Sequence, residues 1–153
     1  MQLCMWCIEN ITEDKKYYIA TNNGACIYNK DGDLIYSNPL DKKKIAKIVK
    51  KLKKKYNPCD ILLTTLDNNY VEMPKDEDRK KQMIMARDYQ IKKGVMGIDI
   101  TICEEKSSKI IKKISEIYSI NIICDDFEAV MEDLKEFFGE NYLIYYDPAM
   151  NIV

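Results

Sequence analysis

The pattern of apolar and polar positions begins with three short strands. Residues 17–20, 25–28 and 34–36 are apolar runs rich in tyrosine and isoleucine, which favour strands. Asn22, Asn23 and Gly24 separate the first two runs, and Asn and Gly enter left-handed backbone conformations at the least cost. Asp31-Gly32 is a strong hairpin signal between the second and third runs. The pattern therefore predicts a strand, a tight corner and a hairpin.

A helical period of apolar positions recurs four times after this hairpin. Residues 41–56 carry a single apolar stripe, and Asp41 is the expected N-cap. The stripe consists of Ile45, Ile48, Val49, Leu52 and Tyr56. Further helices are predicted over 74–93, from Ser107 or Ser108 to 118, and from Asp125 or Asp126 to 138, where Gly139 ends the last one.

Strand patterns lie between these helices. They cover residues 60–65, 70–73, 96–104, 120–124, 142–146 and 150–153, and a brief amphipathic helix is predicted over 1–12. From residue 41 the order reads αββ, then αβαβ, then αββ. This order predicts an α+β fold, with a largely antiparallel sheet that carries its helices on one face.

Composition narrows the class of protein. The 153 residues include 24 Lys and Arg and 25 Asp and Glu, and this balance favours neither nucleic acid nor membrane as a partner. The apolar runs are shorter than the roughly 20 residues of a membrane span, and the N-terminus lacks the pattern of a signal peptide. We expect a cytoplasmic protein.

The residue types available restrict the possible chemistry. The chain has no His, which removes Ser-His-Asp and Cys-His nucleophiles and the common zinc motifs. Cys4 and Cys7 have the spacing of a redox or half-zinc pair, but no second such pair exists. The other four cysteines occupy apolar settings, so we expect them reduced and buried. They are Cys26, Cys59, Cys103 and Cys124.

The helix over 41–56 has a strongly basic outer face. Its lysines between Lys42 and Lys55 could contact phosphate or nucleic acid, because clustered lysines release counterions on binding. The face lacks arginine and interleaved aromatic residues. We therefore favour a solvated surface over a nucleic-acid interface.

The segment from 17 to 40 resembles a known family. The order Ile-Ala-Thr-Asn-Asn-Gly-Ala over 19–25, followed by Ile-Tyr-Asn-Lys-Asp-Gly-Asp-Leu-Ile-Tyr over 27–36, is similar to a junction in Cof-type phosphatases of the haloacid dehalogenase superfamily. The element order from 41 onward also resembles the larger cap type of that family. The resemblance implies a remnant of the catalytic core and a hinge over 1–24, and a cap domain over 25–153.

The catalytic motifs of that family have no counterpart here. The resemblance implies a nucleophilic D-x-D-x-T segment after an apolar strand, together with Mg²⁺, but Asp31-Gly32-Asp33 is the only D-x-D with Gly between, and it sits in the hairpin. Asp125-Asp126 and the acidic cluster 76–78 are interpreted as helix starts. We therefore predict no catalytic or metal residue and no cofactor in this chain; Mg²⁺ is implied only for a full-length member.

Three hypotheses about function follow. The first is a substrate-recognition cap for small phosphorylated metabolites, inactive alone, from a fragment, a truncated product or a free-standing descendant of the enzyme. Asn22, Asn23 and Gly24 would form its hinge and border the substrate cleft, although they could equally be plain turn residues. The second is a non-enzymatic binding or homodimerisation module, and the third is a nucleic-acid binder that uses the basic helix.

Overall fold

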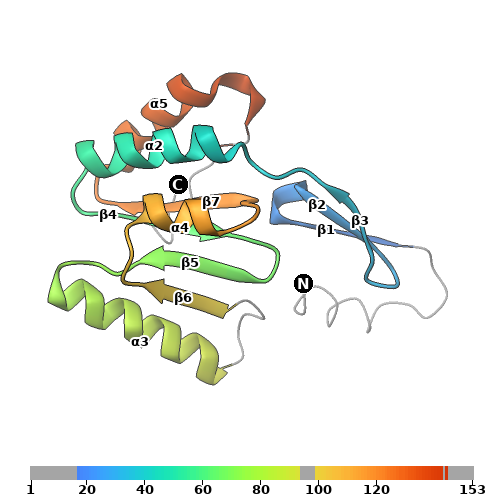
Figure 1. Cartoon of the computed structure of the whole chain (residues 1–153), viewed down its shortest axis with the longest axis horizontal. Helices are drawn as coiled ribbons and strands as arrows, with labels where there is room; N and C mark the ends of the chain where they lie inside the picture. Colours follow the sequence, from blue (N-terminus) through green and yellow to red (C-terminus); the bar gives the residue numbers. More distant parts are fainter. Residues whose placement is uncertain (1–16, 94–98, 143, 145–153) are drawn as a thin grey trace.

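The computed structural model describes residues 17–93, 99–142 and 144, and its strands form two sheets (Figure 1). The strands are β1 Tyr18–Thr21, β2 Cys26–Asn29, β3 Leu34–Ser37, β4 Cys59–Thr64, β5 Asn68–Glu72, β6 Asp99–Cys103 and β7 Ser119–Cys124. The helices are α2 Lys42–Lys55, α3 Glu77–Lys93, α4 Ser107–Lys113 and α5 Phe127–Phe138. Two 3₁₀ turns complete the set: η1 Asn22–Gly24 and η2 Gly139–Asn141.

The larger sheet has the order β6-β5-β4-β7, and the smaller sheet has the order β1-β2-β3. Neighbouring strands run antiparallel in both sheets except for β5 and β6, which are parallel. The parallel pair requires a crossover, which α3 supplies. The expected α+β class with a largely antiparallel sheet is confirmed.

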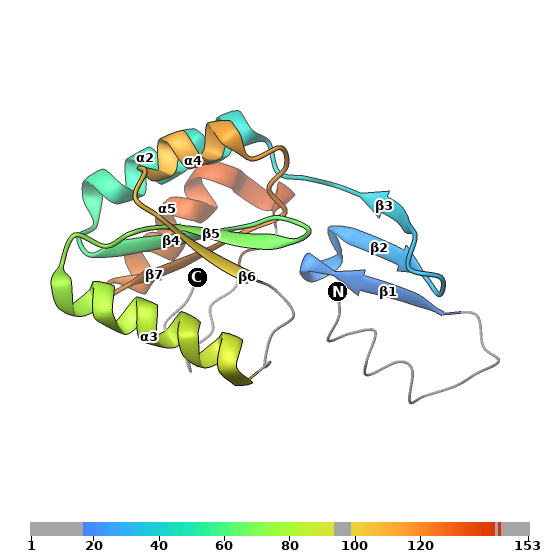
Figure 2. The same cartoon turned by 60° about the horizontal axis from the view of Figure 1, so that its bottom comes forward.

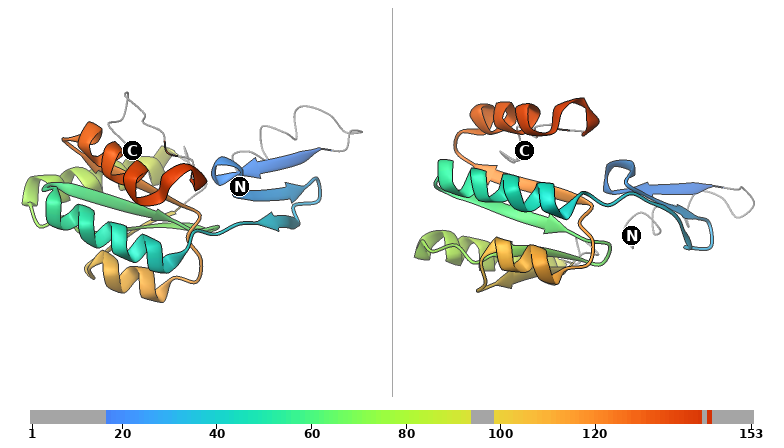
Figure 3. Two further views of the ribbon diagram at one scale, coloured as in Figure 1. Left: turned by 90° about the horizontal axis from the view of Figure 1, so that it is seen from above. Right: turned by 45° about the horizontal axis from the view of Figure 1, so that its top comes forward.

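Three helices share one layer over the larger sheet. α2, α4 and α5 lie on the same face, whereas α3 lies beside the edge strand β6 (Figure 2, Figure 3). Arg79 of α3 bonds Asp60 of β4 at 2.6 Å, and Asp60 alternates with the core residues Cys59 and Ile61. Side chains alternate between the faces of a strand, so α3 reaches the face that the other three helices leave open. The expectation that the helices lie on one face therefore holds for α2, α4 and α5 and is wrong for α3 (Figure 2).

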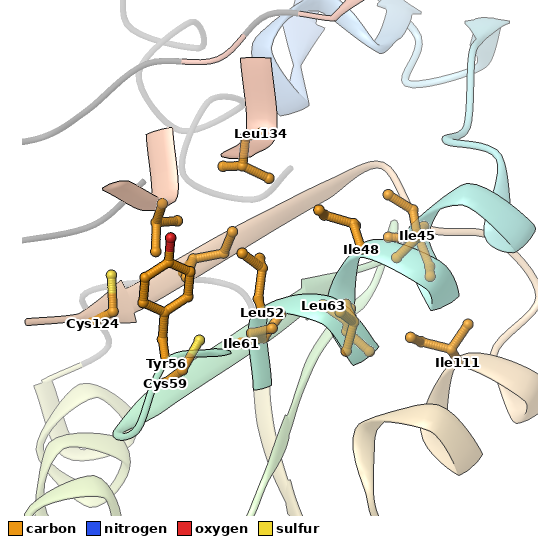
Figure 4. Packing of buried hydrophobic residues seen from close by; sticks show 14 of the residues in the cluster. Ile45, Ile48, Leu52, Tyr56, Cys59, Ile61, Leu63, Ile111, Cys124 and Leu134 are labelled. Atoms are coloured by element: carbon orange, nitrogen blue, oxygen red, sulfur yellow. The ribbon is translucent and has the colours of Figure 1, made fainter. Parts of the chain in front are cut away.

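The main core lies between the larger sheet and these three helices. Leu52 and Ile48 of α2 are fully buried, as are Ile61 and Leu63 of β4 (Figure 4). Ile48 and Leu52 are four residues apart on a helix, and Ile61 and Leu63 are two residues apart on a strand. These spacings keep the apolar side chains on one face of each element. The stripe predicted for α2 is confirmed, including Tyr56 at the helix end.

The ends of α2 and α5 have the predicted caps. The Asp41 carboxylate accepts hydrogen bonds from the backbone amides of Lys43 and Lys44, at 2.8 and 3.3 Å. Asp126 caps α5 by accepting from the amide of Ala129 at 3.2 Å, and Gly139 follows α5 with φ of 64°. The two aspartates satisfy amides that have no partner inside the helix, and the Gly139 amide donates to the Lys135 carbonyl.

The third predicted helix is shorter than its apolar pattern suggests. α4 ends at Lys113, and its N-cap is Lys106 rather than either serine. Ile117 and Tyr118 are buried outside the helix instead: Leu40 donates to the Ile117 carbonyl at 2.7 Å, and Tyr118 donates to the Thr64 carbonyl at 2.8 Å. The prediction of a helix to residue 118 was wrong because these inter-segment bonds replace the helical ones.

A second, smaller core attaches the small sheet. Ile19, Cys26, Tyr28 and Tyr118 are buried together, with Leu66 packed against them. The Tyr118 hydroxyl and Ser37 Oγ lie 2.8 Å apart, so β3 also contacts this tyrosine. Tyr118 therefore belongs to the core of the small sheet although its chain segment leads into the large one.

Several sequence predictions fall outside the described residues. These are the helix over 1–12, the pair Cys4 and Cys7, the end of the second helix at Gly94, and the hairpin expected over 142–153 apart from residues 142 and 144. Among the cysteines that the structure describes, Cys26, Cys59 and Cys124 are free and buried, while Cys103 is only half-buried. Burial raises the pKa of Cys59 to about 11, which leaves its thiol protonated and unreactive near neutrality.

Candidate functional site

The predicted corner at Asn22, Asn23 and Gly24 is a single tight turn. Their φ angles are 49°, 55° and 88°, all in the left-handed region. The Ala25 amide closes the turn by donating to the Asn22 carbonyl at 3.1 Å. A Cβ on Gly24 would meet no heavy atom within 4 Å. Glycine is therefore favoured there by the positive φ and not by a shortage of space. The turn is confirmed, and its role as a hinge stays a prediction.

The turn lies at the junction of the two sheets. η1 is at the end of the larger sheet where β4 ends and β5 begins (Figure 1, Figure 2). Leu66, in the loop between β4 and β5, packs on the small core that contains Cys26. Asn22 Nδ2 lies 3.6 Å from Cys26 Sγ, which ties the turn to the same core. The junction therefore holds the turn against the neighbouring strand ends.

A polar cluster occupies the open face of the larger sheet, which we define as the face away from α2, α4 and α5. Thr64 and Asn69 are directly opposite each other in β4 and β5 and are both buried. The Thr64 hydroxyl donates to Asn69 Oδ1 at 2.7 Å, and Asn121 Nδ2 lies 3.5 Å from Thr64 Oγ1. Hydrogen-bonding groups gathered on one face can orient a polar ligand.

Sequence reasoning missed this cluster. Thr64, Asn69 and Asn121 come from three different strands, and only the register brings them together. The available signal was a polar residue inside each apolar strand, since buried polar side chains require partners.

Asp31 and Asp33, the pair with Gly between them, serve the hairpin between β2 and β3. Asn29 Oδ1 accepts from the amides of Asp31 and Asp33, at 3.0 and 2.8 Å, and Asn29 Nδ2 donates to the Asp33 carboxylate at 2.9 Å. Gly32 between them has φ of 84°. This network is that of an Asx turn, which confirms the interpretation of the segment as a hairpin.

The other acidic clusters begin helices, as predicted. Asp126 caps α5, and Asp76 accepts from the Arg79 amide at 2.9 Å at the start of α3. Among the described residues, no three Cys, Asp or Glu side chains are grouped as a metal site would require. Over the same residues, no helix is both long and apolar enough to cross a bilayer.

An ionic cluster joins α2 to α5. Asp133 of α5 accepts from Tyr56 at 2.7 Å and from Lys55 at 2.8 Å, and Lys51 lies 3.1 Å away. The Lys55 hydrogen bond, helped by Tyr56 and Lys51 and opposed by burial, lowers the pKa of Asp133 to about 2. Both oxygens of this carboxylate have partners, so we assign the cluster to stability.

Comparison with known proteins identifies the relatives of this chain. A family model described as haloacid dehalogenase-like hydrolase matches residues 6–151. A comparison with curated proteins finds no match. Three solved structures are similar in fold, each under 25% identical.

The first solved structure is SMU.1108c from Streptococcus mutans, with 13% identity and a TM-score of 0.59 over 88% of this chain and 46% of that one. A haloacid dehalogenase-like hydrolase from Bacteroides thetaiotaomicron has 16% identity and a TM-score of 0.56, over 82% and 43%. The subclass IIB sugar phosphatase BT4131 has 13% identity and a TM-score of 0.53, over 82% and 42%. The chain thus spans less than half the length of each.

Proposed function

Because the chain belongs to the haloacid dehalogenase-like hydrolase family, we propose that it is the substrate-recognition cap domain of a phosphohydrolase, joined to a short piece of the catalytic core. The observation that carries this proposal is the coverage: 82% to 88% of the chain superposes on only 42% to 46% of the solved relatives. In this proposal residues 1–24 belong to the core and hinge, and residues 25–153 form the cap.

The local chemistry supports catalytic incompleteness. Four of the acidic groups that resemble a family motif have structural partners. In the hairpin, Asp31 pairs with Lys30 and Asp33 accepts from Asn29. Asp76 and Asp126 cap helices. A phosphoryl-transfer site needs free carboxylates and a divalent cation arranged around one phosphate. In the proposal these groups, with Mg²⁺, belong to the catalytic part of a full-length enzyme.

The substrate class follows from the relatives and from the polar cluster. One solved relative is described as a sugar phosphatase, and we propose a small phosphorylated metabolite of that kind for this chain. Thr64, Asn69 and Asn121 supply neutral hydrogen-bonding groups that suit hydroxyl groups. Asn22, Asn23 and Gly24 would let the cap close on the substrate, which excludes water from the reaction.

The first prediction concerns turnover. The purified chain should not hydrolyse p-nitrophenyl phosphate in the presence of Mg²⁺ above background, measured by release of p-nitrophenol beside a complete phosphatase. Turnover that a chelator abolishes would contradict the proposed incompleteness. An Asp31→Asn, Asp33→Asn variant serves as control, because activity that survives it does not come from the Asp-Gly-Asp sequence of the hairpin.

A second candidate function, self-association, is favoured by an exposed apolar strand. Leu34, Ile35 and Tyr36 of β3 are 40%, 53% and 47% exposed, and apolar side chains gathered on one edge strand are typical of pairing surfaces. This function predicts a dimer in analytical ultracentrifugation. The Ile35→Lys variant should then be monomeric, whereas Lys30→Glu in the adjoining turn should leave the dimer intact. A wild-type monomer at all concentrations would count against the idea.

A further inference from the structure

A cavity of about 710 Å³ opens at the end of the larger sheet remote from η1. The second half of α2, the start of β4, the end of β5 and the starts of α3 and α4 surround it. These segments gather at the end of the molecule opposite the small sheet (Figure 1, Figure 3). The cavity is therefore separate from the junction to which the proposed function assigns the substrate.

The walls of this cavity are strongly basic. Six basic and three acidic side chains line it, which gives a formal net charge of +3. The acidic groups already have partners: Glu72 bonds Lys53 at 2.7 Å, Asp60 bonds Arg79 at 2.6 Å, and Asp76 caps α3. Four lysines have no ion-pair partner within the described part of the chain. They are Lys50, Lys54, Lys75 and Lys106.

The four unpaired lysines converge from different segments. Lys50 and Lys54 are one turn apart on α2, Lys75 precedes α3, and Lys106 precedes α4. Like charges around one concavity repel each other, and a concave wall of low dielectric strengthens their combined field. A bound anion would remove that repulsion.

The strand arrangement also favours an anion here. β5 and β6 are parallel. β5 ends at this cavity before α3, and the segment after β6 reaches it at Lys106, before α4 begins. Ligands in sheets with parallel strands commonly bind beyond the carboxyl ends of those strands. The protein's own Glu72 already accepts from the Ser107 amide and hydroxyl, at 2.7 and 2.8 Å, so a carboxylate is stably held beside the cavity.

An extended nucleic-acid surface fits the same lysines less well. Of the nine lysines on α2, five have intramolecular partners: Lys42 with the Ile114 carbonyl, Lys44 with the Tyr142 ring, Lys53 with Glu72, and Lys51 and Lys55 with Asp133. Of the four remaining lysines, Lys50 and Lys54 line the cavity and Lys43 and Lys47 do not. The unpaired charge on α2 is therefore too sparse for a continuous interface along the helix, whereas at the cavity Lys75 and Lys106 add to it.

We propose that this cavity binds a compact polyanion of the di- or triphosphate class, either free or as part of a nucleotide. The site lies outside the substrate cleft of the proposed function and does not depend on it. Lys50 and Lys54 hold one side of the phosphate chain, and Lys75 and Lys106 hold the other.

Calorimetric titration of the whole chain with inorganic tripolyphosphate tests the proposal. We expect binding at low salt that weakens as salt is raised, because partly exposed charges are screened. The Lys50→Glu, Lys54→Glu variant should weaken binding by about tenfold or more, since each 1.4 kcal/mol of lost Coulomb energy is one factor of ten. Both lysines are exposed, so the variant should keep its far-ultraviolet circular dichroism spectrum.

The matched control is Lys43→Glu, Lys47→Glu. These lysines lie on the same helix, are exposed and make the same change in net charge, but they do not line the cavity. Binding should fall by no more than about threefold, the effect of long-range charge alone. An equal loss in both variants would overturn the proposal, as would the absence of binding at low salt.

Two further ligands separate the possible sources of the anion. ATP that binds more tightly than tripolyphosphate, with the same dependence on Lys50 and Lys54, supports a nucleotide; equal or weaker ATP binding supports the phosphate chain alone. A single-stranded oligonucleotide that binds more tightly than either, and that loses affinity equally in both variants, shows a nucleic-acid surface over α2 and overturns the proposal.

Discussion

Replacing Leu52 by alanine is expected to lower the free energy of unfolding by about 3 kcal/mol. Leu52 is 0% exposed and packs with Ile48, Ile61 and Leu63 between α2 and the sheet. The substitution loses the burial of several carbon atoms and leaves a cavity that a packed interior does not close. Urea denaturation followed by far-ultraviolet circular dichroism measures the loss, which is a large part of the roughly 5–15 kcal/mol typical of a domain.

Two variants of α2 control for effects other than the cavity. Leu52→Met keeps the volume and should cost less than about 1.5 kcal/mol. Lys47→Ala changes an exposed residue of the same helix and should alter stability by no more than about 0.5 kcal/mol. A loss below about 1 kcal/mol for Leu52→Ala would mean that this face of α2 is not in the core.

Replacing Asp133 by alanine is expected to lower the free energy of unfolding by about 2 kcal/mol, because the Tyr56 hydroxyl then loses its acceptor in a buried position. Lys51 and Lys55 are 41% and 52% exposed and can turn to water, so they add little to the loss. Chemical denaturation at neutral pH gives the value.

A double-mutant cycle isolates the buried hydrogen bond. Tyr56→Phe removes the hydroxyl while keeping the ring, and in that background Asp133→Ala should cost clearly less than it does in the wild type. Additive losses would show that the two groups do not interact and that the lysines account for the whole effect. Glu136→Ala, which removes a more distant carboxylate beside Lys51, is the matched control on α5.

The same carboxylate makes stability depend on acid pH. The Lys55 hydrogen bond is the largest cause that lowers the pKa of Asp133 from 3.8 to about 2. Because the folded pKa lies below the unfolded pKa, the stabilisation is fully present above about pH 4 and disappears as the pH falls through about 2. Denaturation of Asp133→Asn, which cannot titrate at this position, should therefore show a shallower decline over that interval.

The helices and strands that depend on local chemistry could be predicted from the sequence. Asp41 begins α2, Asp126 begins α5 and Gly139 ends it, because capping is decided by the residue at the helix end. The corner at Asn22 to Gly24 follows from the same local logic. Periodicity was enough to place the apolar stripe of α2 in the core.

Features that depend on distant partners could not be predicted. Ile117 and Tyr118 continue a helical apolar pattern, yet they are buried beyond α4, where their main-chain groups bond Leu40 and Thr64. The polar cluster on the open face and the basic cavity each combine residues from three or more segments. Only the strand register and the packing of helix ends bring such residues together, and no single stretch of sequence encodes either.

The two sheets are joined largely through one aromatic side chain. Tyr118 packs with Ile19, Cys26 and Tyr28 of the small sheet, and its hydroxyl lies 2.8 Å from Ser37 Oγ. Its amide donates to the Thr64 carbonyl of β4. Amino-acid replacements at position 118 should therefore be rare during evolution, and proline is the least tolerated because it also has no amide hydrogen to donate.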